Sequence, residues 1–174
     1  MNIEIYRMNA DVNLPKWGTD YANCFDIEYC PVMDKVHGYD AYNVPVERWI
    51  SKDNQELLIY PGDRLLVPTG LIFVFPESEG SIHQYSLRLH ARSGLALKRG
   101  LVLANSTGIV DVDYRLQVFA LLTNVSGVTQ TIAKHERICQ GEIVKNERVV
   151  FSEALSKPEP MGNRQGGFGS TGTK

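Results

Sequence analysis

Short apolar runs of three to six residues, bounded by turn residues, recur along most of this chain and restrict it to a β-rich fold. The runs that predict strands are Ile3–Tyr6, Arg64–Val67, Leu71–Phe75, Tyr85–Leu89, Leu101–Leu103, Gln117–Leu122, Glu142–Val144 and Val149–Phe151. The chain has 174 residues, 43% of them hydrophobic, with no internal repeat and no interdomain linker. We therefore predict one mostly β domain, a sandwich or a barrel.

Two segments carry helix signals. The first, Ser93–Lys98, contains helix-tolerant residues and is followed by Gly100, which is suited to end a helix. The second and weaker candidate is Val46–Leu58, which Pro45 would begin. Residues 31–56 otherwise lack strand alternation and are long for a connection, so we predict a surface elaboration there. A lid or a partner-binding arm is the less favoured alternative.

Charge and composition exclude several function classes. The formal net charge of −2 disfavours nucleic acid as the main partner. There is no apolar run of eighteen residues and no basic-then-apolar start, so we expect no membrane segment and a cytoplasmic location, the host cytoplasm if the source is viral. The three cysteines have no zinc-site spacing, which predicts reduced thiols. The four histidines form no ligand pair at helical spacing.

Two blocks in the middle of the chain suggest a site. Arg92-Ser93-Gly94 precedes the short helix and could bind an anion at its N-terminus, although Ser93 could simply cap the helix. In the block Asn105–Arg115, a strand would place Asp111 and Asp113 on one face, as in a paired-carboxylate metal site. The alternative is a hairpin in which Asp113 caps its own turn, and both could be partly true.

Two later blocks are less telling by themselves. Glu136–Gln140 is interpreted as an ordinary strand with an Arg–Glu surface pair. The last thirteen residues, GNRQGGFGSTGTK, are rich in glycine and predict a mobile tail at 162–174 that carries the groups of a phosphate clamp. A P-loop is rejected, because the lysine is not followed by Ser or Thr and no helix can follow.

Taken in order, the stretches RSGLALKRG, NSTGIVDVDYR, ERICQ and GGFGSTG, with Ala22–Ile27 before them, resemble the motifs of the homotrimeric dUTP pyrophosphatases (dUTPases). The resemblance runs from about residue 20 to the C-terminus, apart from an insertion at 31–56. It implies a distorted jelly-roll, or β-clip, domain over residues 1–161 with one short helix. It also implies hydrolysis of dUTP to dUMP and pyrophosphate, in sites shared between the three copies of a homotrimer and closed by the tail.

The resemblance assigns roles to individual residues. Asp111 would activate the attacking water, Tyr114 would lie under the deoxyribose, and Asn105 would help the hairpin backbone bind uracil. Mg²⁺ would be held by the triphosphate and water, with Asp26 near the hydrated ion. The remaining substrate-binding residues are Arg92, Ser93, Gly94, Gly108, Val110 and Gln140 in the body, and Arg164, Phe168, Gly169, Ser170 and Thr171 in the tail.

Two other functions stay open at this point. A dCTP deaminase, alone or combined with dUTP hydrolysis, would have the same fold but would need a glutamate base near the hairpin. A non-catalytic trimer that senses nucleotides or binds a partner is the alternative from another class.

Overall fold

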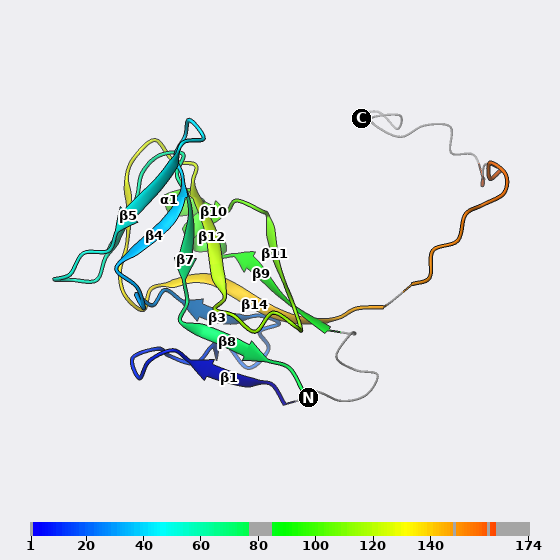
Figure 1. Cartoon of the computed structure of the whole chain (residues 1–174), viewed down its shortest axis with the longest axis horizontal. Helices are drawn as coiled ribbons and strands as arrows, with labels where there is room; N and C mark the ends of the chain where they lie inside the picture. The colour runs from blue at the N-terminus through cyan, green and yellow to red at the C-terminus, as the bar shows by residue number, and fades with distance from the viewer. Residues whose placement is uncertain (1, 77–84, 148, 160, 163–174) are drawn as a thin grey trace.

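The computed structural model describes residues 2–76, 85–147, 149–159 and 161–162, and the regular structure within them is mostly β (Figure 1). The strands are β1 (Glu4–Arg7), β2 (Lys16–Trp17), β3 (Phe25–Glu28), β4 (Lys35–Tyr39), β5 (Pro45–Trp49), β6 (Leu57–Ile59), β7 (Arg64–Pro68), β8 (Leu71–Val74), β9 (Tyr85–Ala91), β10 (Leu101–Leu103), β11 (Thr107–Asp111), β12 (Phe119–Asn124), β13 (Gln130–Ile132) and β14 (Arg137–Lys145). The described helix is α1 (Ser93–Arg99). The prediction of a mostly β domain is confirmed.

Two five-stranded sheets form the body, with strand orders β11-β9-β14-β3-β2 and β10-β12-β7-β4-β5. We call them the first and the second sheet. Two smaller sheets, β1-β8 and β13-β6, complete the fold, and every described pairing is antiparallel.

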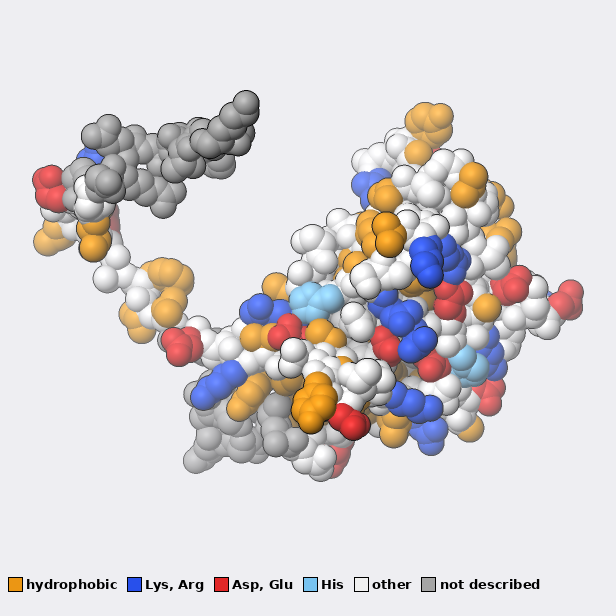
Figure 2. Space-filling view, turned by 180° about the vertical axis from the view of Figure 1, so that it is seen from behind, with side chains coloured by type: hydrophobic (Ala, Val, Ile, Leu, Met, Phe, Trp, Pro, Cys, Tyr) orange, Lys and Arg blue, Asp and Glu red, His pale blue; other side chains and the backbone are white. Residues whose placement is uncertain are grey.

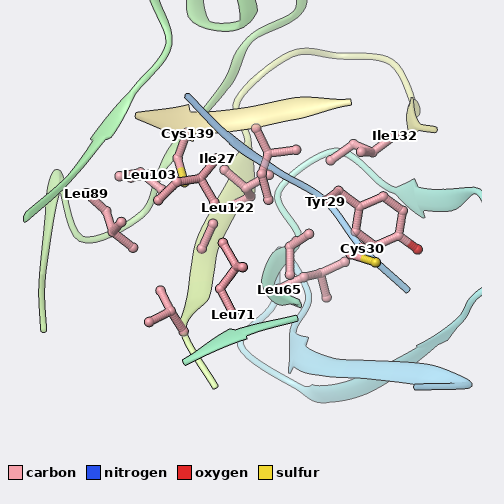
Figure 3. Close-up of a cluster of buried hydrophobic side chains, with 14 of the residues drawn as sticks. Ile27, Tyr29, Cys30, Leu65, Leu71, Leu89, Leu103, Leu122, Ile132 and Cys139 are labelled. Carbon is pink, nitrogen blue, oxygen red and sulfur yellow. The ribbon is translucent and has the colours of Figure 1, made fainter. Parts of the chain in front are cut away.

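The two large sheets enclose one hydrophobic core. Leu89 and Ile27 of the first sheet and Leu65 and Leu122 of the second are buried in it, as Figure 3 shows. Along β7, β9 and β12 such buried side chains alternate with more exposed ones, so each sheet has one face in the core and one outer face.

The short helix lies where the sequence predicts it. Gly100 ends it in the left-handed conformation with φ 64°, and its N–H donates to the carbonyl oxygen of Ala96. Glycine adopts this conformation without the steric cost of a Cβ atom. The boundary at Gly100 confirms the interpretation made from the sequence.

The predicted helix at Val46–Leu58 is wrong. Its first part is β5, which pairs with β4 to form a hairpin at the edge of the second sheet. Along β5, half-buried residues alternate with exposed ones, as expected for a strand. The Arg48 guanidinium donates to both carboxylate oxygens of Asp63 at 2.8 Å. Because Asp63 is distant in sequence and buried, this contact favours the strand in a way that local propensity does not reveal. Residues 31–56 thus contain both strands of a hairpin that extends the second sheet.

The predicted strand at Val149–Phe151 is also wrong. After β14 the chain leaves the body, and Val150 and Phe151 are 96% and 91% exposed. Figures 1 and 2 show this segment extending away from the body of the molecule. An apolar run needs a neighbouring strand to become part of a sheet, and the described part of this single chain offers none here.

No helix in the described residues is long and apolar enough to cross a membrane.

Candidate functional site

A buried carboxylate in the first sheet brings several predicted site residues together. Asp26 on β3 is only 7% exposed. Its Oδ1 accepts hydrogen bonds from Nε of Arg92 at 3.0 Å and from Nε2 of Gln140 at 3.3 Å, and its Oδ2 accepts one from Nη1 of Arg137 at 3.0 Å. We call these four residues the arginine cluster. The structure therefore unites Asp26, Arg92 and Gln140 and adds Arg137.

The packing of β3 against β14 explains why these residues meet. Gln140 lies opposite Asp26, and the next pair along is Gly141 opposite Phe25. A Cβ atom on Gly141 would lie 2.3 Å from Cε2 of Phe25, so the close approach of the two strands requires glycine. Cross-strand partners share a face, which directs Asp26 and Gln140 to the outer side of the sheet.

Arg137 reaches the same carboxylate because the pairing is irregular. The β3–β14 register shifts between Arg137 and Cys139. In a regular strand, side chains three positions apart point to opposite faces, so Arg137 and Gln140 would diverge. The extra residue lets both reach Asp26. The predicted Arg137–Glu136 surface pair is not formed, since Glu136 pairs with Arg99. No local sequence signal indicates the irregularity, so the sequence did not predict that Arg137 is a site residue.

The charge of the arginine cluster favours an anion. Two guanidinium groups face one carboxylate, which leaves one net positive charge, and the Arg137 side chain is 54% exposed. Within the described residues no group of three His, Cys, Asp or Glu side chains could hold a metal ion. Asp26, expected near a hydrated ion, is enclosed by arginines. The guanidinium and amide N–H groups around Asp26 do not fit a protein-ligated metal ion.

The residues after Arg92 present open surface. Arg92 itself is the helix N-cap and makes no side-chain capping bond, so the alternative that Ser93 caps the helix is wrong. Ser93 and Gly94 are both exposed, and a Cβ atom added to Gly94 would meet nothing within 4 Å. Glycine is therefore not required at position 94 by the described chain itself.

A second group of predicted residues lies along and just after β11. Asn105 and Gly108 are close, because Nδ2 of Asn105 is 3.5 Å from the position of a Cβ on Gly108. Val110 is half-buried, and Asp111 ends the strand with an exposed side chain. The N–H of Tyr114 donates to the carbonyl oxygen of Asp111 at 3.1 Å, which places the tyrosine one tight turn later.

Tyr114 is held by its own turn. Its hydroxyl donates to the carbonyl oxygen of Gln117 at 3.1 Å, while its side chain remains partly exposed. The amide side chain of Gln117 is itself buried, where it accepts a hydrogen bond from the N–H of Gly70. This anchoring fixes the phenol group and leaves ring surface for a ligand.

The paired-carboxylate interpretation of Asp111 and Asp113 is wrong. The strand stops at Asp111, and residues 112–113 form a turn, so the two acids do not share a strand face. The hairpin alternative is not formed either, because β11 pairs with β9, whereas β12 belongs to the second sheet. Among the described residues Asp113 has no side-chain hydrogen-bond partner, so it caps no turn.

Asp111 and the arginine cluster lie at opposite ends of one sheet face, whereas the Gly108 end of β11 lies near the cluster. Asp111 is opposite Ser86 on β9, whereas Gln140 is opposite His90, four residues further along the same strand. At a rise of about 3.3 Å per residue, Asp111 and Gln140 are offset by about 13 Å along β9. Arg92 lies six residues beyond Ser86, so its offset from Asp111 is about 20 Å. A single chain therefore does not bring Asp111 to the arginine cluster.

Cysteine chemistry does not contribute to this site. Cys139 is next to Gln140 but fully buried, and burial raises the pKa of its thiol to about 12. Burial also raises the pKa of the Cys24 and Cys30 thiols. The reactive thiolate form is thus suppressed at all three.

A separate groove of about 600 Å³ lies on the second sheet beside the β4–β5 hairpin, lined in part by Tyr39, Arg64 and Leu66. It contains none of the predicted site residues. The predicted tail residues, Arg164, Phe168, Gly169, Ser170 and Thr171, lie outside the residues that the structure describes.

Comparison with known proteins gives a consistent picture. A family model described as dUTPase matches residues 52–172. The deoxyuridine 5'-triphosphate nucleotidohydrolase of Rickettsia prowazekii is 40% identical over 123 residues, which cover 71% of this chain and 78% of that protein. The enzyme of the same name from Chlamydia trachomatis serovar L2 is 36% identical over 119 residues, covering 68% and 78%.

Solved structures with the same fold include two dUTPases. That of Streptococcus mutans has a TM-score of 0.62 at 23% identity and covers 87% of this chain and 100% of its own. That of Staphylococcus bacteriophage 80alpha with dUPNHPP has a TM-score of 0.72 at 17% identity and covers 98% of both chains. These similarities support the jelly-roll-like fold that the sequence predicts.

Proposed function

The chain belongs to the dUTPase family, and we propose from this premise that it hydrolyses dUTP to dUMP and pyrophosphate in sites assembled from several copies of the chain. The observation that carries the proposal is the position of the family's motif residues. They form two groups, a carboxylate with an anchored tyrosine and a cationic cluster, on one sheet face.

Asp111 is proposed as the general base. Its exposed carboxylate ends a paired strand, where the antiparallel ladder with β9 fixes its backbone. In this role it would accept a proton from a water molecule in line with the α-phosphorus as the bond to the β-phosphate oxygen breaks. Tyr114, anchored one turn later, would lie under the deoxyribose and leave no room for a 2′-hydroxyl.

The arginine cluster is proposed to hold the leaving pyrophosphate. Arg92 and Gln140 present nitrogen donors, and the open surface at Ser93 and Gly94 gives a phosphate group close access to the backbone. Mg²⁺ on the triphosphate would add charge neutralisation there. From the sequence, Phe168 would cover the uracil, and Arg164 with residues 169–171 would contact the outer phosphates.

A homotrimer is proposed because Asp111 is offset along the strand by about 13 Å from Gln140 and by about 20 Å from Arg92, too far for one chain to place the base and both phosphate-binding residues on one triphosphate. The Asp111 carboxylate and the cationic cluster are opposite in charge, so a head-to-tail contact between copies would bring them together. A closed ring of copies satisfies every such contact.

The proposal is tested by measuring pyrophosphate release from dUTP, dCTP, dTTP and UTP, and ammonia release from dCTP. We expect turnover of dUTP alone. Asp111→Asn should lower kcat by roughly 10²–10⁴-fold, the usual effect of losing a positioned base. Asp113→Asn, two residues away in the turn, is the matched control and should retain most activity. Near-normal turnover by Asp111→Asn would refute the assignment of the base, and ammonia release would indicate a deaminase.

A further inference from the structure

Arg137 has no role in the motif resemblance, yet it shares the Asp26 carboxylate with Arg92. Each arginine occupies a different carboxylate oxygen at 3.0 Å. In addition, Nη1 of Arg92 donates to the backbone carbonyl oxygen of Arg137 at 3.1 Å. The two guanidinium groups are therefore fixed beside one another by side-chain and main-chain contacts.

The two arginines differ in exposure. The side chain of Arg92 is 23% exposed and that of Arg137 is 54% exposed, while Asp26 beneath them is 8% exposed. Arg137 is thus the outer member of the pair. A guanidinium group has five N–H donors, and within the described residues the Arg137 side chain bonds only to Asp26. Most of its donors remain available to a ligand.

The available donors suit a phosphate group better than a metal. Asp26 neutralises only one of the two guanidinium charges, and its oxygens already accept from Arg92, Arg137 and Gln140. Planar guanidinium groups bind phosphate oxygens in a bidentate manner, with directional and charge-assisted hydrogen bonds. The strand irregularity that turns Arg137 to this face also lets the consecutive residues Ile138 and Cys139 both be buried in the core, so the core packing holds it in place.

We propose that Arg137 is a further phosphate-binding residue, and that Asp26 is a positioning residue which holds Arg92 and Arg137 as a two-arginine clamp for the pyrophosphate part of the nucleotide. The inference rests on the proposed function for its physiological ligand. The clamp itself is defined by an inorganic probe, pyrophosphate, which requires no turnover.

The first experiment titrates the full-length protein with inorganic pyrophosphate by calorimetry in the absence of Mg²⁺. Arg137→Gln should weaken binding by roughly 10–100-fold, the effect of losing charge-assisted hydrogen bonds. Arg137→Lys should give an intermediate affinity, since lysine keeps the charge without the planar donors. Arg64→Gln, on the second sheet, is the matched control and should bind as the wild type does. Unchanged binding by Arg137→Gln overturns the inference.

The second experiment separates the clamp from the proposed function. With dUTP, Arg137→Gln should raise KM by about tenfold or more and change kcat less, because the interaction exists before the transition state. If the wild type binds pyrophosphate through Arg137 but does not hydrolyse dUTP, the clamp stands and the proposed function fails. If Arg137→Gln hydrolyses dUTP with an unchanged KM, the proposed function stands and the clamp fails.

The role of Asp26 is tested with Asp26→Asn. A positioning role predicts weaker pyrophosphate binding even without Mg²⁺, because both arginines lose their anchor. A role at a hydrated metal ion predicts weakening only when Mg²⁺ is present, and that result overturns the positioning role. Thermal unfolding checks that the variant is folded, and the exposed Arg137 variants keep the clamp testable if it is not.

Discussion

At the scale of single residues, Asp26 determines the geometry of the cationic side of the site. Its carboxylate is almost fully enclosed and is compensated by hydrogen bonds from two arginines and a glutamine. A buried charge of this kind stabilises a protein only while its partners are present, and removing it leaves the partners without a counter-charge.

Asp26→Ala should therefore lower the free energy of unfolding by about 2–3 kcal/mol, less than for a fully buried pair because Arg137 is half exposed. The control is Asp11→Ala, whose carboxylate is 69% exposed and pairs with Lys134, with an expected change within about 0.5 kcal/mol. Urea denaturation at one fixed protein concentration measures both. If the two substitutions lowered the free energy of unfolding equally, the buried Asp26 carboxylate would contribute no more to stability than an exposed one.

Residue identities were predictable where motifs carry them. Arg92 and Gln140 were expected to bind phosphate, and the structure brings them together around Asp26. Arg137 was not expected, because its orientation depends on a register shift that arises between strands far apart in sequence. The expected pairing of Asp111 with Asp113 failed for a related reason, since the length of β11 is set by its pairing with β9.

At the scale of elements, the contact between β3 and β14 positions the arginine cluster. The Phe25 ring lies against Gly141, one position from Asp26 and Gln140 on their respective strands. A methyl group at position 141 would overlap the ring, and overpacking of this kind costs about 1–3 kcal/mol.

Gly141→Ala should thus destabilise the protein by about that amount, whereas Gly94→Ala, which meets no atom within 4 Å, should change stability by less than about 0.5 kcal/mol. Because the clash is with Phe25, the cost of Phe25→Leu should be smaller in the Gly141→Ala background than in the wild type. A double-mutant cycle from urea denaturation measures this coupling. Additive effects within about 0.5 kcal/mol would contradict direct contact.

The elements themselves were predictable in part. Apart from Val149–Phe151, every predicted strand overlaps a strand of the structure, and the helix predicted at Ser93–Lys98 is α1. The β4–β5 hairpin was missed, because Pro45 and Trp49 fit the sequence pattern of a helix start. The buried Arg48–Asp63 ion pair that favours the strand joins residues distant in sequence, so the local sequence does not reveal it. Its tight turn depends on Asp40, whose Oδ1 accepts from the backbone N–H groups of Tyr42 and Val44.

At the scale of the whole molecule, the core contains groups that must stay neutral. Burial raises the pKa of the Cys139 thiol to about 12 and that of Cys30 above its ordinary value, and it also raises the pKa of Tyr29. Above the pKa of an unfolded thiol, near 9, unfolding releases a proton that the folded core retains. Stability from these groups is complete below that pH and is lost as the pH rises toward the folded value.

The free energy of unfolding should consequently fall between about pH 9 and pH 11, with Cys139 contributing roughly 1.4 kcal/mol per pH unit. Cys139→Ala should reduce this slope, whatever its effect on stability at neutral pH. Urea denaturation at several pH values compares the two slopes, and ionisations common to both proteins cancel. Identical slopes would mean that Cys139 does not retain its proton in the folded state.

The mostly β fold and the family followed from the sequence, whereas the separation of the site into two groups required the strand register. The apolar run at Val149–Phe151 was expected to form a strand, but in the single chain it lies exposed away from the body. The hydrophobic pattern of a sequence shows which side chains are apolar but not which surface they contact.

The central claim, a dUTP-hydrolysing site shared between copies, is tested most directly by mixing two inactive variants. Asp111→Asn lacks the base and Arg92→Gln lacks a phosphate-binding residue, so with dUTP well below the wild-type KM each alone should be nearly inactive while keeping the wild-type assembly size. Mixed rings formed by co-expression contain sites that combine an intact Asp111 from one copy with an intact Arg92 from another. For random mixing of equal amounts, about one site in four is intact, so about a quarter of the wild-type dUTP turnover should return. Turnover no higher than that of the separate variants would contradict the shared site.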